Sequence, residues 1–353
     1  MANRRKTKEV RVMKLADVFY QSLLEGTRSK WDVNQALSGS IPWDAWREGL
    51  RGALTDSLGK KPVPVDLAVE RGEPVACEGY TRERLSFMSE KDLRVPAYLL
   101  VPDEAKDDTQ VVVALHGHGY GVRAIVGLSP DDQPIGDEEE YQKNFAVRLV
   151  RAGFVVIAPE LLGFGDLRLE RDDDPANPNA ISCGAISSML LTIGRTMAGA
   201  RVWQAMRSLD ALRAMGYAGD ASAMGISGGG LVCAYFAALD DCIRACCVSG
   251  FANTFRGSIF AMHHCIDNYP PNILLEMEEP DVLSAIAPRP MIWESGDEDP
   301  IFPLKHVYEA RDTVAKVYEK LGAADAFEMD VFHGDHQIHG TVAMDFLRKH
   351  GWK

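Results

Sequence analysis

The second half of the chain alternates short apolar runs with longer stretches that have helical periodicity. The short runs predict buried strands, and the stretches between them predict helices. Strands are expected at 111–115, 154–158, 221–224, 245–249, 291–294 and 327–332. Helices are expected at 141–152, 194–215, 231–239, 303–321 and 341–350. Continuously apolar strands that alternate with helices are typical of a parallel sheet covered on both faces.

The first part of the chain has two other patterns. Residues 12–58 are predicted to be helical, with an apolar stripe at a spacing of three or four residues formed by Trp43, Trp46, Leu50, Leu54 and Leu58. Residues 63–101 hold short β-rich segments separated by turn residues, and these predict antiparallel strands. We therefore expect residues 1–62 to form an N-terminal helical extension that packs on an α/β domain of residues 63–353.

Three segments near 120–139, 163–193 and 252–285 interrupt the alternation of strands and helices and are expected to be loop insertions. The first two are rich in glycine, proline and aspartate and follow strands. Loops that follow parallel strands rise at the carboxyl edge of the sheet, where open α/β sheets bind ligands. The insertions and the N-terminal helices are thus candidates for a lid or for a surface between subunits of a homo-oligomer, and the sequence does not separate these roles.

Composition narrows the classes of partner. The 353 residues carry a formal net charge of −13, which argues against nucleic acid and anionic membrane as partners. No apolar run approaches the roughly 18 residues of a membrane-spanning helix, and no apolar segment of a signal peptide follows the basic N-terminus. The seven cysteines have irregular spacing, which predicts reduced, mostly buried thiols in a cytoplasmic protein.

A nucleophile motif of the form G-x-S-x-G occurs at residues 225–229, between an expected strand and an expected helix. In this context the serine, Ser227, sits on a strained turn with its hydroxyl pushed outward, and the flanking glycines avoid collisions with neighbouring backbone. The N–H of Gly228 lies at the start of the helix, where unpaired N–H groups favour a developing oxyanion.

An activated serine needs a base, and the base needs an acid that orients it. Asp299, after the strand at 291–294, is the expected acid because the following proline fixes its backbone, and Asp297 is the alternative. After the last strand we expect His336 to be the base, with His333 and His339 as supporting or solvated side chains.

The same three histidines could instead bind a metal such as zinc, copper or nickel. No carboxylate or cysteine set completes a metal site around them in the sequence, so neither a metal nor a cofactor is expected.

A second oxyanion donor is expected in the loop that follows the strand at 111–115. We assign the N–H of His118 to this role, together with that of Gly228. Other residues expected in the pocket or around it are His116, Gly117, Gly119, Tyr120, Glu160, His264 and Cys265. Among these, Glu160 either braces the loop or lies on the surface, and His264 and Cys265 are more typical of a pocket wall than of a nucleophilic pair.

From about residue 80 to the C-terminus the chain resembles the α/β-hydrolase superfamily, because the nucleophile, the acid and the histidine follow in that family's order. It is similar in particular to the dienelactone-hydrolase and acetyl-xylan-esterase-like branch. The segments that carry this likeness are 43–59, 116–119, 158–165, 263–270, 286–290 and 299–303.

The resemblance implies the α/β-hydrolase fold, with a mostly parallel central sheet, helices on both faces and antiparallel strands at the start. It also implies a serine esterase that acts on small acyl esters of the acetyl type through an acyl-enzyme. Dienelactone hydrolases use a cysteine nucleophile, so with Ser227 their own reaction is not expected. The alternatives are a serine peptidase or amidase of the same fold, and a ligand-binding protein without turnover.

Overall fold

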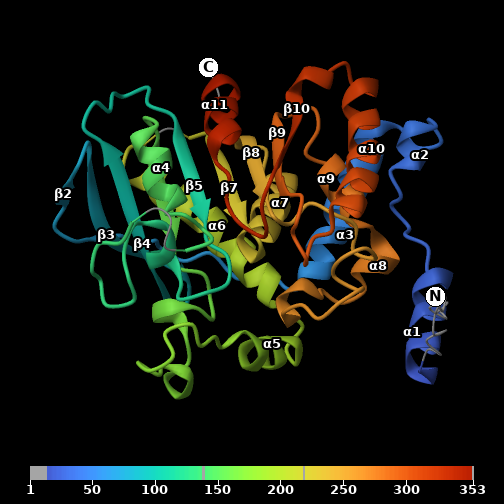
Figure 1. The fold of residues 1–353 in the computed structure, drawn as a ribbon, viewed down its shortest axis with the longest axis horizontal. Coiled ribbons are helices and arrows are strands. Elements are labelled where there is room, and N and C mark those ends of the chain that lie inside the picture. Colours follow the sequence, from blue (N-terminus) through green and yellow to red (C-terminus); the bar gives the residue numbers. More distant parts are fainter. Residues whose placement is uncertain (1–13, 137–139, 218, 352–353) are drawn as a thin grey trace, which may run out of the picture.

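The computed structural model describes residues 14–136, 140–217 and 219–351. A single ten-stranded sheet runs through it in the order β1-β3-β4-β6-β5-β7-β8-β9-β10, with β2 paired to β3 (Figure 1). The strands are β1 (Glu70–Arg71), β2 (Val75–Cys77), β3 (Tyr80–Glu90), β4 (Leu93–Pro102), β5 (Val111–Leu115), β6 (Val155–Pro159), β7 (Ala221–Ile226), β8 (Ile243–Ser249), β9 (Met291–Gly296) and β10 (Phe327–Phe332). All neighbours from β6 to β10 are parallel, whereas β1 to β4 are antiparallel, so the expected mostly parallel sheet with antiparallel strands at its start is confirmed.

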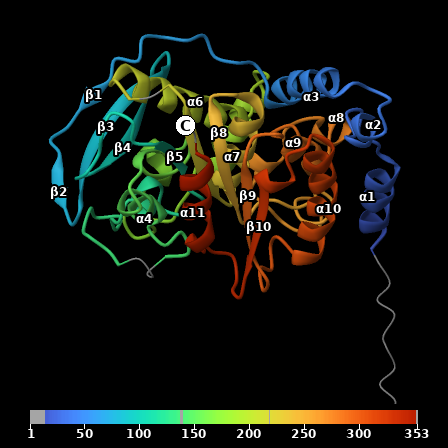
Figure 2. The same cartoon turned by 90° about the horizontal axis from the view of Figure 1, so that it is seen from above.

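Helices cover both faces of this sheet, as expected. They are α1 (Leu15–Gly26), α2 (Asn34–Leu37), α3 (Trp43–Leu58), α4 (Phe145–Arg151), α5 (Cys183–Leu191), α6 (Met197–Ala214), α7 (Gly228–Leu239), α8 (Ile273–Glu276), α9 (Glu279–Ser284), α10 (Leu304–Lys320) and α11 (Thr341–His350). Figure 2 shows α4 and α11 on one side of the sheet and α3 and α6 on the other. No helix within the described ranges is long and apolar enough to span a membrane.

Strand β5 shows how the sheet divides the core in two. Its residues are all completely buried, and alternate side chains point to opposite faces. Val111, Val113 and Leu115 join the core beneath α3, α6 and α7, whereas Val112 and Ala114 join the core beneath α4 and α11. A strand buried on both faces needs the continuous apolar run that the sequence shows at this position.

The structure differs from the sequence prediction for one strand and for the start of one helix. The apolar run at 63–69 is not a strand; it crosses the surface as an irregular segment, and only β1 and β2 follow it before β3. The helix expected from residue 141 begins at Phe145, because Lys143 and Asn144 adopt positive φ and interrupt helical geometry.

Candidate active site

The G-x-S-x-G motif forms the turn between β7 and α7. Ser227 has φ of 57° and ψ of −122°, a conformation that L-residues adopt rarely, and its N–H donates to the carbonyl of Ser249 at 3.0 Å. A side chain at Gly225 would collide with the carbonyl of Gly229, and one at Gly229 would collide with the carbonyl of Leu115. The two glycines therefore allow the strand, the turn and the helix to approach closely enough to hold this conformation.

An acid–base pair lies beside this turn. Nδ1 of His336 is 2.7 Å from Oδ2 of Asp299, while Oδ1 of Asp299 accepts from the N–H groups of Ile301 and Phe302. Burial raises the pKa of Asp299, but the hydrogen bond and the charge of His336 outweigh that effect, so the pKa lies below its ordinary value. The His336 ring stacks between Tyr141 and Phe302, which fixes its plane.

A cavity of about 330 Å³ joins these groups. It is lined by His118, Tyr141, Ser227, Gly228, His263, His264, Cys265, Asn268, Ile301, Phe302 and His336. Nε2 of His336 is buried and makes no hydrogen bond within the described part of the chain. The structure thus brings the predicted nucleophile and the predicted base to one cavity, with the base held from behind by the predicted acid.

Asp297, His333 and His339, which the sequence offers beside Asp299 and His336, lie apart from the Asp299–His336 pair. Asp297 is 3.2 Å from Nδ1 of His333, whose side chain is 80% exposed, and it also accepts from the N–H of Gly334. His339 pairs with Asp330 at 2.6 Å. Each of the three imidazoles therefore contacts a different carboxylate, and neither His333 nor His339 lines the cavity.

The loop after β5 packs against the turn that carries Ser227. The N–H of Gly117 donates to Gln142 at 2.6 Å, and the carbonyl of His118 accepts from the hydroxyl of Tyr141 at 2.7 Å. A Cβ on Gly117 would collide with the hydroxyl of Tyr141 and with the carbonyl of Ile226, so only glycine leaves room here. Gly228 is the first residue of α7, and its N–H has no acceptor within the helix.

Several other predicted pocket residues support this loop from behind. His116 and Glu160 are completely buried, and Nε2 of His116 accepts from the N–H of Leu161 at 3.0 Å. That nitrogen also lies 3.0 Å from Oε1 of Glu160, and this oxygen accepts from the N–H of Val122. Glu160 therefore braces the loop and does not lie on the surface. Gly119 and Tyr120 continue the loop, but like His116 and Gly117 they do not line the cavity.

Part of the cavity wall comes from the insertion at 252–285. His264 lies 3.1 Å from the hydroxyl of Ser258 and packs edge-on against Phe302, and burial lowers its pKa. Cys265 is partly buried, and its thiol lies in the wall and not on a strand-to-helix turn. All seven cysteines are free thiols, four of them buried.

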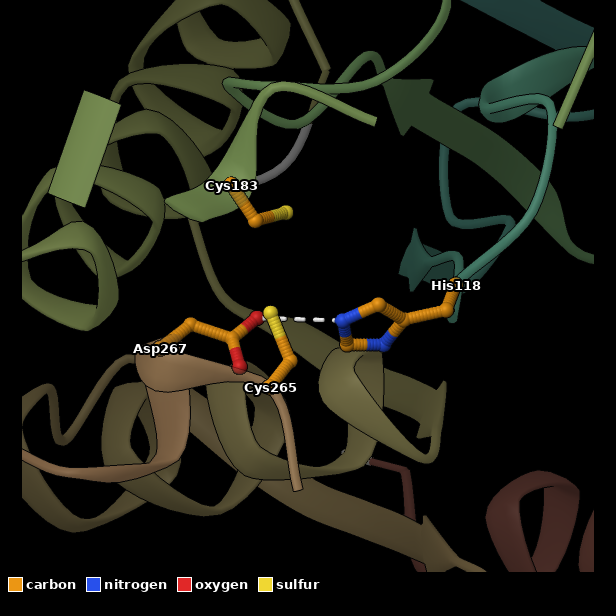
Figure 3. A group of neighbouring side chains, drawn as sticks. All are labelled: His118, Cys183, Cys265 and Asp267. Carbon is orange, nitrogen blue, oxygen red and sulfur yellow. Dashed lines mark ion pairs between the residues drawn. The ribbon is translucent and has the colours of Figure 1, made fainter. Parts of the chain in front are cut away.

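One group of described residues has the donor atoms to hold a metal ion: His118, Cys183, Cys265 and Asp267 (Figure 3). Sequence reasoning did not assemble it: Asp267 lies in the segment 263–270, but no pattern connects that segment with Cys183 or assigns a metal to it. The cavity residues that it also missed are Tyr141, His263, Asn268, Ile301 and Phe302. All but Tyr141 stand in the segments 263–270 and 299–303, which could have indicated them.

This fold, with a serine on the turn after β7 and an acid and a histidine on later loops, defines the α/β-hydrolase class. The sequence profile of the Abhydrolase family matches residues 7–333, and the chain belongs to that family. The provisionally named hydrolase YtaP of Bacillus subtilis (strain 168) is 25% identical over 291 residues, which are 80% of this chain and 90% of that protein.

Three solved structures share the fold at low sequence identity. One, from Bacteroides fragilis and provisionally named an acetyl xylan esterase, has a TM-score of 0.74 and 17% identity, covering 99% of this chain and 92% of that one. A glucuronoyl esterase from Solibacter usitatus has a TM-score of 0.62, 16% identity and coverages of 87% and 93%. Acetyl xylan esterase 1 from Thermoanaerobacterium sp. has a TM-score of 0.57, 15% identity and coverages of 96% and 98%. The family match confirms the expected membership of the α/β-hydrolases, and these three structures share the fold.

Proposed function

We propose that this protein is a serine-dependent carboxylic ester hydrolase for small acyl esters. The observation that carries the proposal is the meeting of Ser227 and His336 at one cavity, with Asp299 bonded to the far side of the imidazole. Ester hydrolysis is also the activity that the names of the similar solved structures give to those proteins.

In the proposed reaction, Oγ of Ser227 attacks the ester carbonyl while Nε2 of His336 takes the hydroxyl proton. Asp299 accepts from Nδ1–H of His336, which keeps Nε2 free to act as the base and stabilises the imidazolium that forms. The N–H groups of Gly228 and His118 stabilise the negative oxygen of the tetrahedral intermediate.

The acyl-enzyme forms when the alcohol leaves with the proton that His336 returns to it. Water then attacks the acyl carbonyl, again with His336 as the base, and releases the carboxylic acid and the serine. Tyr141 and Phe302, on either side of the ring, limit how far the imidazole can rotate between the two half-reactions. The cavity of about 330 Å³ favours short acyl groups over long ones.

Hydrolysis of p-nitrophenyl acetate, butyrate and octanoate tests the proposal. The wild-type protein should hydrolyse the two short esters with a higher kcat/KM than the octanoate. Ser227→Ala should lower kcat roughly 10⁴-fold or more. Ser188→Ala is the matched control, because among the residues that the structure describes that exposed hydroxyl on α5 bonds only to the carbonyl of Gly184 in its own helix. Equal rates for wild type and Ser227→Ala would refute the proposed nucleophile.

A further inference from the structure

Three loops meet at a second site beside the cavity. His118 comes from the loop after β5, Cys183 begins α5, and Cys265 and Asp267 belong to the segment around the short 3₁₀ helix Ile266–Asn268. One donor atom from each of the four side chains lies within 4.8 Å of every other. Figure 3 shows the imidazole, the two thiols and the carboxylate turned toward a common centre.

The donor set matches a particular class of ion. Two sulfurs, one imidazole nitrogen and one carboxylate oxygen are ligands that Zn²⁺ binds tetrahedrally. Zinc bonds of about 2.0–2.3 Å imply separations of about 3.3–3.8 Å between donor atoms, so a contraction of roughly 1 Å or less would close the sphere. Nε2 of His118 is 3.4 Å from Oδ2 of Asp267 and makes no hydrogen bond within the described residues.

Arg201 supports the ligands from outside. It is 1% exposed, donates to Sγ of Cys183 at 2.9 Å and forms an ion pair with Asp267. It also donates to the carbonyl of Leu162, which fixes the guanidinium in place. Hydrogen bonds to ligand atoms of this kind orient the ligands of metal sites, and Asn268 supplies another to Oδ1 of Asp267 at 2.7 Å.

The charges of the group balance with a dication. When an ion binds, both thiols release their protons to solvent, so that two thiolates and one carboxylate carry three negative charges and the guanidinium of Arg201 carries one positive charge. A divalent cation makes this bound cluster neutral while His118 stays uncharged, so binding leaves no unbalanced buried charge, which would be costly.

We propose that His118, Cys183, Cys265 and Asp267 bind one Zn²⁺ that clamps the three loops together beside the active site. The four proposed ligands include neither Ser227 nor His336, and the proposal does not depend on the proposed ester hydrolysis. It does bear on the cavity, because Cys265 lines the wall and the backbone of His118 is the proposed oxyanion donor.

Titration of the reduced, chelator-treated full chain with Co²⁺ tests the site. Cobalt in a tetrahedral site with thiolate ligands gives a charge-transfer band in the near ultraviolet and d–d bands in the visible, and both should saturate at one ion per chain. Zn²⁺ added afterwards should remove both bands. The double variant Cys183→Ser, Cys265→Ser should lose them, whereas Cys242→Ser, which changes a partly buried thiol outside the group, should keep them.

The single variant Cys265→Ser covers the case in which the double variant does not fold. Its partly buried position tolerates serine, and the loss of one of two thiolates should reduce the charge-transfer band by about half. Absence of stoichiometric cobalt bands in the wild-type protein, or their persistence in the folded double variant, would overturn the proposal. Ser227→Ala should bind cobalt normally, so a failure of the esterase proposal remains distinguishable from a failure of this one.

Discussion

Asp297 and Asp299 stand two positions apart in one loop, but they differ in burial and in the groups that they contact. Asp299 is 6% exposed, accepts two backbone N–H groups and contacts the histidine that lines the cavity. Asp297 is at the surface and contacts a solvent-exposed histidine. A buried carboxylate held in a fixed orientation can keep an imidazole in one tautomer, whereas an exposed one loses most of its effect to solvent.

We therefore expect different results from the two Asp→Asn changes. Asp299→Asn should lower kcat by roughly 10⁴-fold, because an amide cannot stabilise the imidazolium and favours the wrong tautomer. Asp297→Asn, the matched control, should leave kcat unchanged. Steady-state kinetics with p-nitrophenyl acetate measure both, and equal losses in the two variants would contradict the assignment of Asp299.

Sequence reasoning reached residues that stand at strand ends, because a parallel sheet brings those positions to one edge. Ser227, His336, Asp299 and His118 all follow strands, and the structure brings them together at or beside one cavity. Arg201 and Cys183 lie on helices, and nothing in their local pattern indicates a partner more than sixty positions away. Their contacts depend on how two insertions pack over the sheet, which periodicity does not reveal.

At the scale of elements, the helices of residues 1–62 differ in how they are held. Trp46, Leu50 and Leu54 on α3 are completely buried in the core that also contains α6 and α7. Helix α1 has no buried residue, and it exposes Val18, Phe19 and Leu23. We propose that α3 is an integral part of the folded unit, whereas α1 contributes little to its stability.

Truncation of one leucine on each helix tests this difference. Leu50→Ala should lower the free energy of unfolding by about 2–5 kcal/mol, because it removes buried methyl groups and leaves a cavity. Leu23→Ala, in which the leucine is 53% exposed, should change it by about 0.5 kcal/mol or less. Urea unfolding followed by circular dichroism gives both values, and a small effect of Leu50→Ala would show that α3 folds independently of the core.

The sequence predicts the strands that are buried on both faces more reliably than it predicts the strands at the start of the sheet. The apolar runs of β5 and β6 are five residues long and rich in β-branched residues, which favours strands buried on both faces over buried helices. The run at 63–69 alternates apolar and polar residues as an exposed strand would, but Pro62 and Pro64 lack the N–H groups that a ladder needs. In the structure it connects α3 to β1 across the surface, and Ala68 adopts φ of 41°.

At the scale of the whole molecule, the carboxylate of Asp241 links the N-terminal helix α3 to the sheet through ion pairs. Asp241, between α7 and β8, forms ion pairs with Arg47 and Arg51 of α3 and lies 3.5 Å from Arg289 before β9. Partial burial raises the pKa of Asp241, but the hydrogen bonds from Arg47 and Arg51 outweigh it and lower the pKa to about 2. The folded state therefore favours the ionised form more than the unfolded state does.

This difference predicts how stability depends on pH. An aspartate whose pKa is lowered by folding contributes stability above its unfolded pKa of about 3.9 and loses it as pH falls toward the folded value. Because Asp241 is half exposed, Asp241→Asn should lower the free energy of unfolding by about 1 kcal/mol or less near neutral pH. The gap between variant and wild type should stay constant down to about pH 4 and narrow below it. Urea unfolding between pH 7 and about pH 3 measures this difference in unfolding free energy. A difference that grows as the pH falls would contradict the account.

The cytoplasmic location expected from the cysteines and the division at residue 62 stay predictions. The membership of the chain in the Abhydrolase family does not depend on them, since the match covers residues 7–333. The central claim that experiment must test is that Ser227 is the nucleophile.

The most direct measurement is covalent labelling with a fluorophosphonate, followed by intact-mass analysis and peptide mapping. An activated serine attacks the phosphorus, so the wild-type protein should gain one adduct per chain, and the modified peptide should carry it on Ser227. Ser227→Ala should gain none. A folded wild-type protein that takes up no label, or that carries it on another residue, would contradict the assignment of Ser227 as the nucleophile.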